Sequence, residues 1–312
     1  MLDPLFPPPV VLVDLFTPIS RALNLNTLPL HVHEMIGSLS FYFFLGSTIS
    51  PRLSTWLFPR TYPHLSRKTQ INWDIHVVSQ FQSLLVNALA LWVIFADKER
   101  KDLSWEGRIF GYTGAEGLVQ AFVAGYFLWD LVMCVVYIDI QGLGPLAHAV
   151  SAVIVTGLGF RPFGMYYGMA FVLYELSTPF LNIHWFLDKL HMTGSHAQLY
   201  NGITLLFVFF MCRLVWGSYV TVQIYADLRR VVQRRVEGEI ITGADTEKPI
   251  SLDTGLLALR GTQLPGKHTL PMWLIVAYVG SNTMLMVLNF YWFSRMIQAV
   301  TKRFVKKKPR KD

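Results

Sequence analysis

Long apolar stretches recur along this chain and constrain its fold more than any other feature. A helix that crosses a bilayer needs about 20 mainly apolar residues, and seven stretches reach or approach that length. They are residues 34–50, 77–96, 118–138, 144–160, 164–187, 199–225 and 270–297. Only 15% of the residues are charged, whereas soluble domains carry about 25%. The sequence therefore predicts an all-α polytopic membrane protein with about seven transmembrane helices.

The fourth and fifth stretches are the least regular. Glycine and proline flank the fourth stretch on both sides, and almost no loop separates it from the fifth. Glu175 and Pro179 interrupt the fifth stretch. We therefore expect a tight helical pair, one member of which is tilted, broken or incompletely spanning. Residues 146–162 in particular are predicted to form a thin or tilted span.

Polar segments divide the rest of the chain. Residues 1–33 contain a run of three prolines and lack the basic start of a signal peptide. We expect this N-terminal segment to lie at the membrane surface or to pack against the bundle. The first transmembrane helix and its loop would occupy residues 34–67. The longest polar connection, 226–269, follows much later, and a basic tail covers 298–312.

The net charge of +7 comes from basic residues in loops and in the tail. Membrane topology explains this distribution, so we expect no nucleic-acid partner. Residues 226–269 and the last twelve residues each contain seven Lys and Arg, and seven spans would place the two groups on opposite faces. We favour a cytosolic tail, because clustered lysines suit the anionic cytosolic leaflet. The tail also loosely resembles a dilysine-type retrieval signal of the endoplasmic reticulum.

Four ionisable residues lie well inside the apolar stretches, and such residues usually face a bundle interior, a partner or a cavity. They are Asp130, His148, Glu175 and Arg213. Around Glu175 the polar positions follow helical spacing, because Glu175, Pro179 and Asn182 share one stripe with Thr178 beside them. One interpretation is a buried clamp in which Glu175 is protonated or paired to Arg213 or His148. The other is a ligand or catalytic site.

The remaining candidates also leave alternatives open. His148 suits a general base, a nucleophile or a satisfied core histidine, and Asp130 suits either function or helix packing. Arg213 keeps its charge, so it would pair with an acid or bind an anionic headgroup. His184, Asp188 and His191 have a spacing that can ligate a metal, but they lack a fourth ligand. We therefore expect no metal site.

A run of motifs resembles the TLC-domain family, specifically the small multipass members that are distantly related to ceramide synthases. The central motif is Glu-Leu-Ser-Thr-Pro-Phe-Leu-Asn (Glu175–Asn182), followed by Trp185. Other stretches agree in order, namely INWDIHVVSQFQSLLVN at 71–87, GYFLWDL at 125–131, LAHAVSA at 146–152 and LYNGITLLFVFFMCRLV at 199–215. The resemblance covers residues 68–297, which we take as the TLC domain.

The resemblance implies six helices arranged as a bundle or barrel around a lipid-accessible cavity, with one additional helix before them. Glu175 would face that cavity. In ceramide synthases a pair of histidines carries acyl transfer from acyl-coenzyme A. Here His148 stands at the second histidine and Ala147 at the first, while Gln82 stands where smaller members often have histidine. The pair has become a single histidine, which weakens acyl transfer without excluding it.

The leading hypothesis is an endoplasmic reticulum membrane protein that binds lipid or acyl chains and influences membrane lipid composition. The first alternative is an acyltransferase that uses acyl-coenzyme A, with His148 as base or nucleophile and Asp130 and Glu175 orienting the site. The second alternative is a cargo adaptor or sorting receptor. Lipid or headgroup contacts are assigned to Arg213, Asn182, Thr178, Gln82 and Trp185. Membrane lipids are the expected partners, and a homodimer stays an open alternative.

Overall fold

The computed structural model describes residues 1–161, 163–236 and 270–305, in which all regular structure is helical. The first rod consists of α2 (Leu28–Phe44), the π-helical turn η1 (Leu45–Ile49) and α3 (Ser50–Leu57). Three single helices follow, α4 (Arg67–Ala96), α6 (Gly114–Val136) and α8 (Leu143–Gly159). The later rods are α9 (Met165–Val172) with η4 (Leu173–Ser177) and α10 (Thr178–Lys189), then α11 (His196–Phe209) with η5 (Phe210–Trp216) and α12 (Gly217–Val236), and finally α14 (Met272–Val305). Short elements flank them, namely α1 (Val10–Leu23), η2 (Tyr62–His64), η3 (Glu99–Asp102), α5 (Trp105–Phe110) and α7 (Ile138–Gln141). Seven rods therefore make up the described part of the chain.

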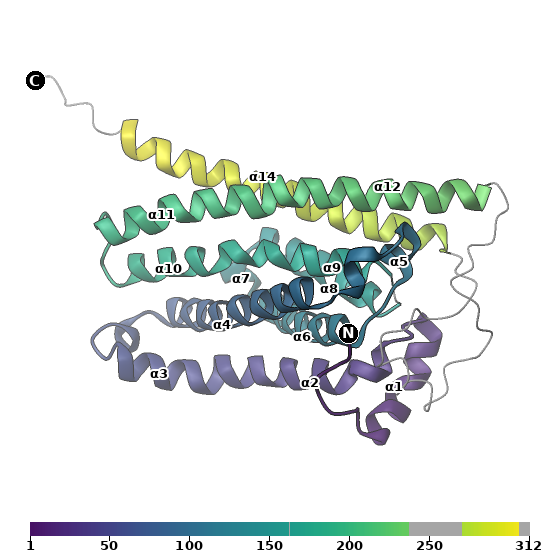
Figure 1. Cartoon of the computed structure of the whole chain (residues 1–312). Helices are drawn as coiled ribbons and strands as arrows, with labels where there is room; N and C mark the ends of the chain where they lie inside the picture. Colours follow the sequence, from purple (N-terminus) through teal and green to yellow (C-terminus); the bar gives the residue numbers. More distant parts are fainter. Residues whose placement is uncertain (162, 237–269, 306–312) are drawn as a thin grey trace, which may run out of the picture.

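Six of these rods close into a ring, and the seventh lies outside it. Around the ring, α4 contacts α6, α6 contacts α8, and α8 contacts α14. The ring continues from α14 to η5 and α12, from α11 to α10, and from α10 back to α4. The rod that contains α2 packs on the outer side of α6. Figure 1 shows the rods running side by side, with α14 crossing α11–α12 at a slant. The predicted bundle of six helices with one before it is confirmed.

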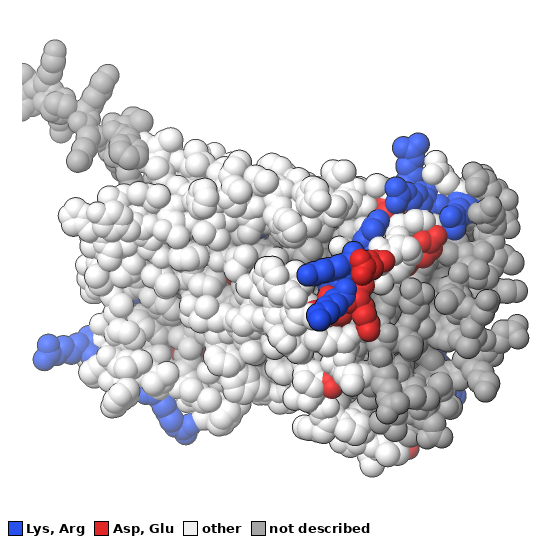
Figure 2. Space-filling model, in the orientation of Figure 1, with Lys and Arg blue, Asp and Glu red and all other residues white. Residues whose placement is uncertain are grey.

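The length and polarity of the rods suit a membrane. Four described helical segments are long and apolar enough to cross a bilayer, namely Arg67–Ala96, Gly114–Val136, His196–Arg234 and Met272–Thr301. Figure 2 shows one face on which charged side chains gather toward the end that holds α5, while the long middle of the rods is uncharged. The described chain is therefore a multipass membrane protein, as the sequence predicts.

The irregular fourth and fifth stretches behave as expected. Helix α8 has 17 residues, so at 1.5 Å per residue it is about 25 Å long, short of a hydrocarbon core of about 30 Å. The short length of α8 confirms the prediction of a thin span. The fifth stretch is broken, because α9 ends at Val172 and the 3-10 turn η4 separates it from α10. Pro179 lies in the first turn of α10, where its missing N–H costs no helical hydrogen bond.

Two boundaries differ from the sequence-based expectation. The first rod begins at Leu28 and not at residue 34, because Pro29 is well suited to the first turn of a helix. At the other end α12 extends to Val236, so part of the predicted polar connection is helical. The remainder of that connection, 237–269, and the tail residues 306–312 lie outside the described residues. The N-terminal segment packs against the bundle, where the backbone N–H of Ala115 donates to the carbonyl of Met1.

The crossing of α2 and α6 depends on small residues. A Cβ placed on Gly125 would lie 2.7 Å from the carbonyl oxygen of Met35 and would overlap the hydroxyl of Ser38. Transmembrane helices approach closely where glycine replaces a larger side chain, since packing and not hydrophobic exclusion holds them together in lipid. Gly125 therefore allows the outer rod to sit directly against the ring.

Candidate functional site

An ion pair fastens two broken rods of the ring together. The guanidinium of Arg213, in the π-helical turn η5, donates from Nη2 to Glu175 Oε1 at 3.3 Å and to Thr178 Oγ1 at 3.2 Å. Thr178 in turn donates to Glu175 Oε2 at 2.8 Å. Glu175 lies in the 3-10 turn η4, so both partners stand at interruptions of regular α-helix. π-Helical turns are rare and often mark functional positions.

Arg213 is bonded on all sides of its guanidinium. Nε donates to the carbonyl of Tyr174 at 3.1 Å and to Ser177 Oγ at 3.0 Å, and Nη1 donates to Asn289 Oδ1 at 3.1 Å. The Asn289 bond links α14 to the pair. A buried charge is tolerated when it is paired and its donors are satisfied. The clamp interpretation of Glu175, with Arg213 as its partner, therefore describes the observed geometry.

A cavity lies inside the ring and reaches all six of its rods. Its walls come from α4, α6, α8, the α9–η4 segment, η5 and α14, and both Glu175 and Arg213 are part of its lining. The cavity leaves about 90 Å³ for the centres of water-sized spheres, where one water needs about 10–15 Å³. Most of the lining is apolar, including Val86, Val123 and Val155. A slender apolar chain or several waters would fit this space.

Gln82 and His148 are among the polar lining side chains that have no hydrogen bond within the described part of the chain, as is Tyr278. Gln82 is 0% exposed, and neither its Oε1 nor its Nε2 has a partner among the described residues. His148 contacts the rings of Phe127 and Trp292 at centroid distances of 5.8 and 5.6 Å and is bonded to none of the described residues. Buried polar groups are normally paired. Gln82 and His148 therefore have hydrogen-bonding capacity that the described residues leave unused.

Asp130 and three other predicted site residues are not part of the cavity lining. Asp130 is close enough to Glu175 for their charges to interact, and the thiol of Cys134 lies 4.0 Å from Oδ1 of Asp130. Asn182 accepts a hydrogen bond from His76 at 2.8 Å and donates to Ser79 at 3.2 Å. Trp185 stacks on His76 with ring centroids 4.3 Å apart. Asn182 and Trp185 thus join α10 to α4, and Thr178 belongs to the ion-pair network.

The structure adds functional candidates that the sequence analysis did not single out. Asn282 and Asn289 of α14 both line the cavity. Asn282 donates toward Thr221 and Tyr225 at 3.3 and 3.4 Å. Their i, i+7 spacing on an apolar helix is the signal that identifies this face, because such positions lie on one stripe. The sequence analysis considered His184, Asp188 and His191 as metal ligands and expected no metal there. Among the described residues these three do not form a metal-ligating group, and Asp188 accepts hydrogen bonds from Lys189 and Thr193.

Comparison with known proteins gives the same family as the motifs. Residues 72–298 match the family model of the TLC domain. The chain is 32% identical over 295 residues to an uncharacterised TLC domain-containing protein of Schizosaccharomyces pombe, with 95% of this chain and 87% of the relative aligned. It is 27% identical over 291 residues to topoisomerase I damage affected protein 4 of Saccharomyces cerevisiae, with 91% and 89% aligned. Human TLC domain-containing protein 4 is 30% identical over 172 residues, with 52% and 62% aligned. The six-rod ring, its ordered motifs and these matches agree, and the chain belongs to the TLC-domain family.

Proposed function

We propose that this protein binds a lipid or acyl chain within its ring, in the endoplasmic reticulum membrane, and thereby influences membrane lipid composition. The single observation that carries the proposal is the amide of Gln82, which has no partner among the described residues and is fully buried in the wall of a mainly apolar cavity. A ligand with an apolar chain and one hydrogen-bonding group would satisfy both features. Ligand sites usually combine apolar walls with a few such polar groups.

The lining offers both kinds of contact that such a ligand needs. Valine and phenylalanine side chains offer an apolar wall, while Gln82 and His148 offer a donor and acceptors. Arg213 is less available, because its donors are directed at five protein acceptors. The bound polar group is therefore a neutral ester, amide or hydroxyl and not a phosphate. This assignment narrows the lipid to one with an uncharged group next to its chain.

Acyl transfer is the second candidate, favoured by the free imidazole of His148 at the cavity. In that reaction an amine or hydroxyl of the acceptor lipid attacks the thioester carbonyl of acyl-coenzyme A while His148 takes its proton. The carbon–sulfur bond breaks and coenzyme A leaves as the thiol after receiving that proton. His148 has no carboxylate orienting it among the described residues, so binding is favoured over catalysis.

Gln82→Leu tests the binding proposal with two measurements: the substitution should raise the thermal stability of the protein and lower the amount of lipid that it binds. A buried unpaired amide costs about 1–3 kcal/mol, so we expect the delipidated Gln82→Leu protein to unfold at a higher temperature than the wild type. We expect the same variant to retain several-fold less copurified lipid, because one hydrogen bond contributes about 0.5–1.5 kcal/mol. Native mass spectrometry with lipid extraction measures the second effect. Gln198→Leu is the control, since Gln198 is buried but bonded to the N–H of Gly194 and should destabilise when replaced.

His148→Ala separates the binding protein from the acyltransferase. Both proteins are incubated with acyl-coenzyme A and an extract of membrane lipids, and free coenzyme A and acylated lipid are measured. The binding proposal expects no acyl adduct and no product in the wild type, together with lipid that remains bound in the variant. Product that forms in the wild type and vanishes in His148→Ala would replace the binding proposal with acyl transfer.

The location and orientation of the chain are part of the same proposal. The last twelve residues contain seven basic residues, which an anionic cytosolic leaflet attracts at about 1 kcal/mol each. We expect a C-terminal epitope tag to be accessible to antibody after selective permeabilisation of the plasma membrane, in a reticular pattern. Replacement of the tail lysines by serine should move the protein out of the endoplasmic reticulum. Staining that requires permeabilisation of internal membranes would contradict a cytosolic tail.

A further inference from the structure

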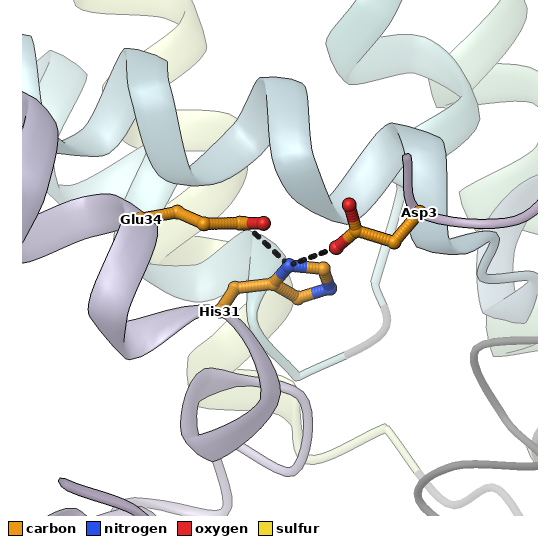
Figure 3. Close-up of side chains that lie close together, drawn as sticks. All are labelled: Asp3, His31 and Glu34. Carbon is orange, nitrogen blue, oxygen red and sulfur yellow. Dashed lines mark hydrogen bonds and ion pairs between the residues drawn. The ribbon is translucent and has the colours of Figure 1, made fainter. Parts of the chain in front are cut away.

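A second group of buried polar side chains lies apart from the cavity, where the N-terminal segment meets the start of α2. Asp3 of the N-terminal segment and His31 and Glu34 of α2 point toward one another (Figure 3). One ligand atom from each lies within 4.8 Å of the others. His31 Nδ1 is 2.7 Å from Glu34 Oε2 and 3.4 Å from Asp3 Oδ2. The three side chains are 0%, 1% and 4% exposed for His31, Glu34 and Asp3.

The charges of this cluster do not balance. When ionised, Asp3 and Glu34 would together carry a charge of −2, and their ion pairs within the described residues involve only histidines. Arg100, at the same end of the ring, does not neutralise them, because it is paired with Glu116. A buried charge requires a partner of opposite sign.

One oxygen of the cluster is also left without a bond. Glu34 Oε1 has no hydrogen-bond partner among the described residues, and His33 Nε2 lies 3.8 Å from it. The other oxygens are partly used, since Asp3 Oδ1 accepts from the N–H of Leu5 at 2.9 Å. An unpaired carboxylate oxygen in a buried cluster of anions is an additional sign that a cation is accommodated there.

The surroundings hold His31 in the orientation that a metal ligand needs. Its Nε2 lies 2.6 Å from the hydroxyl of Tyr112, so Nδ1 is the nitrogen that faces the two carboxylates. Ligating histidines are usually fixed by a hydrogen bond from their other ring nitrogen. A Cβ on Gly117 would lie 2.6 Å from His31 Cε1, and one on Gly114 would lie 3.0 Å from Asp3 Cβ. The two glycines of α6 therefore allow the cluster to be held closely from a third side.

We propose that Asp3, His31 and Glu34 bind a divalent transition-metal ion such as Zn²⁺, which fastens the N-terminal segment to α2 at one end of the ring. A divalent ion neutralises the two carboxylates, and one imidazole with two carboxylates is a ligand set that Zn²⁺ accepts. Bonds of about 2.0–2.2 Å to three ligands require ligand atoms about 3–3.5 Å apart. The Asp3–His31 distance already fits, and the Glu34–His31 distance must open by a few tenths of an ångström. The proposal replaces the sequence-based expectation of no metal, because it joins residues that no local spacing connects.

Metal analysis of the full-length protein tests the proposal. Protein purified in detergent without chelator should contain about one zinc per chain, and Co²⁺ added after chelator treatment should give a saturable visible absorption band. Glu34→Gln and Asp3→Asn should each lower the bound metal at least tenfold. Asp14→Asn and His64→Gln should retain it, because both residues are exposed and lie outside the cluster.

Each remaining outcome contradicts the site. Wild-type protein that holds no zinc and gives no Co²⁺ band would mean that protons, and not a metal ion, neutralise the cluster. If Glu34→Gln and Asp3→Asn retained as much metal as the wild type, the metal would be bound at another site. If either variant fails to fold, the Co²⁺ titration of the wild type still decides, since it needs no substitution. The failure of this site would leave the lipid proposal unaffected, because the cavity shares none of these residues.

Discussion

Arg213→Leu is expected to lower the stability of the purified protein by about 3–5 kcal/mol, since removing one member of a buried pair leaves an uncompensated charge. The variant deprives Glu175 of its ion pair and leaves the carbonyl of Tyr174 and the amide oxygen of Asn289 without their guanidinium donors. It also removes the hydrogen bonds by which Arg213 joins η5 to η4 and α14. Thermal or denaturant unfolding in a mild detergent measures the loss.

Two further variants separate the ion pair from a general effect of losing an arginine. Arg295→Leu is the matched control, because Arg295 is exposed on α14, and exposed substitutions usually change stability by less than about 0.5 kcal/mol. The double variant Glu175→Leu with Arg213→Leu should cost less than the sum of the single variants, because neither charge is then left alone. Equal losses for Arg213→Leu and Arg295→Leu, or strict additivity in the double variant, would contradict the clamp.

Gly125→Ala should destabilise the protein by about 1–3 kcal/mol, although alanine is the better helix former. The added Cβ would overlap Ser38 and the backbone of Met35, so α2 must move away from α6, and overpacking of this kind costs about that much. The loss of stability is measured by heating the protein and determining by size-exclusion chromatography the fraction that remains folded. The effect is large because backbone and not only a flexible side chain blocks the new methyl group.

Gly280→Ala is the matched control for that substitution. Gly280 also lies within a helix, α14, but a Cβ there meets nothing within 4 Å. Its replacement should be neutral or stabilise by about 0.5–1 kcal/mol through helix propensity alone. If both variants were stabilised alike, α2 would not pack against α6 at Gly125 in the way that the structure describes.

The sequence predicts the rods well because their signal is local. An apolar stretch of transmembrane length identifies α4, α6 and α14 without reference to the rest of the chain. Glycine and proline around residues 142–162 likewise predict the short α8, and Pro179 predicts a break near η4. The motif resemblance then supplies the ring, which periodicity alone does not determine.

Contacts between distant residues are what the sequence leaves open. Glu175 had three candidate states, and only the folded chain shows that Arg213, 38 residues away, is its partner. In the sequence, Gln82 is notable only because it stands where smaller members of the family often have histidine. The folded structure is needed to show that its amide has no partner among the described residues. Asn182 and Trp185 are close to Glu175 in sequence, yet they join α10 to α4 and are not part of the cavity lining. The 3-10 turn η4 interrupts the α-helical spacing on which the predicted common stripe depended.

Photo-crosslinking with a diazirine-bearing neutral lipid tests the central claim of a lipid chain inside the ring. After irradiation of the protein in nanodiscs, the labelled residues are identified by peptide mass spectrometry. We predict saturable labelling of cavity-lining residues such as Val86 and Val155, which excess unlabelled lipid competes away and Gln82→Leu reduces. Exposed outer residues such as Val132 and Val287 should be labelled without saturation. Labelling confined to the outer residues would contradict a lipid-binding cavity.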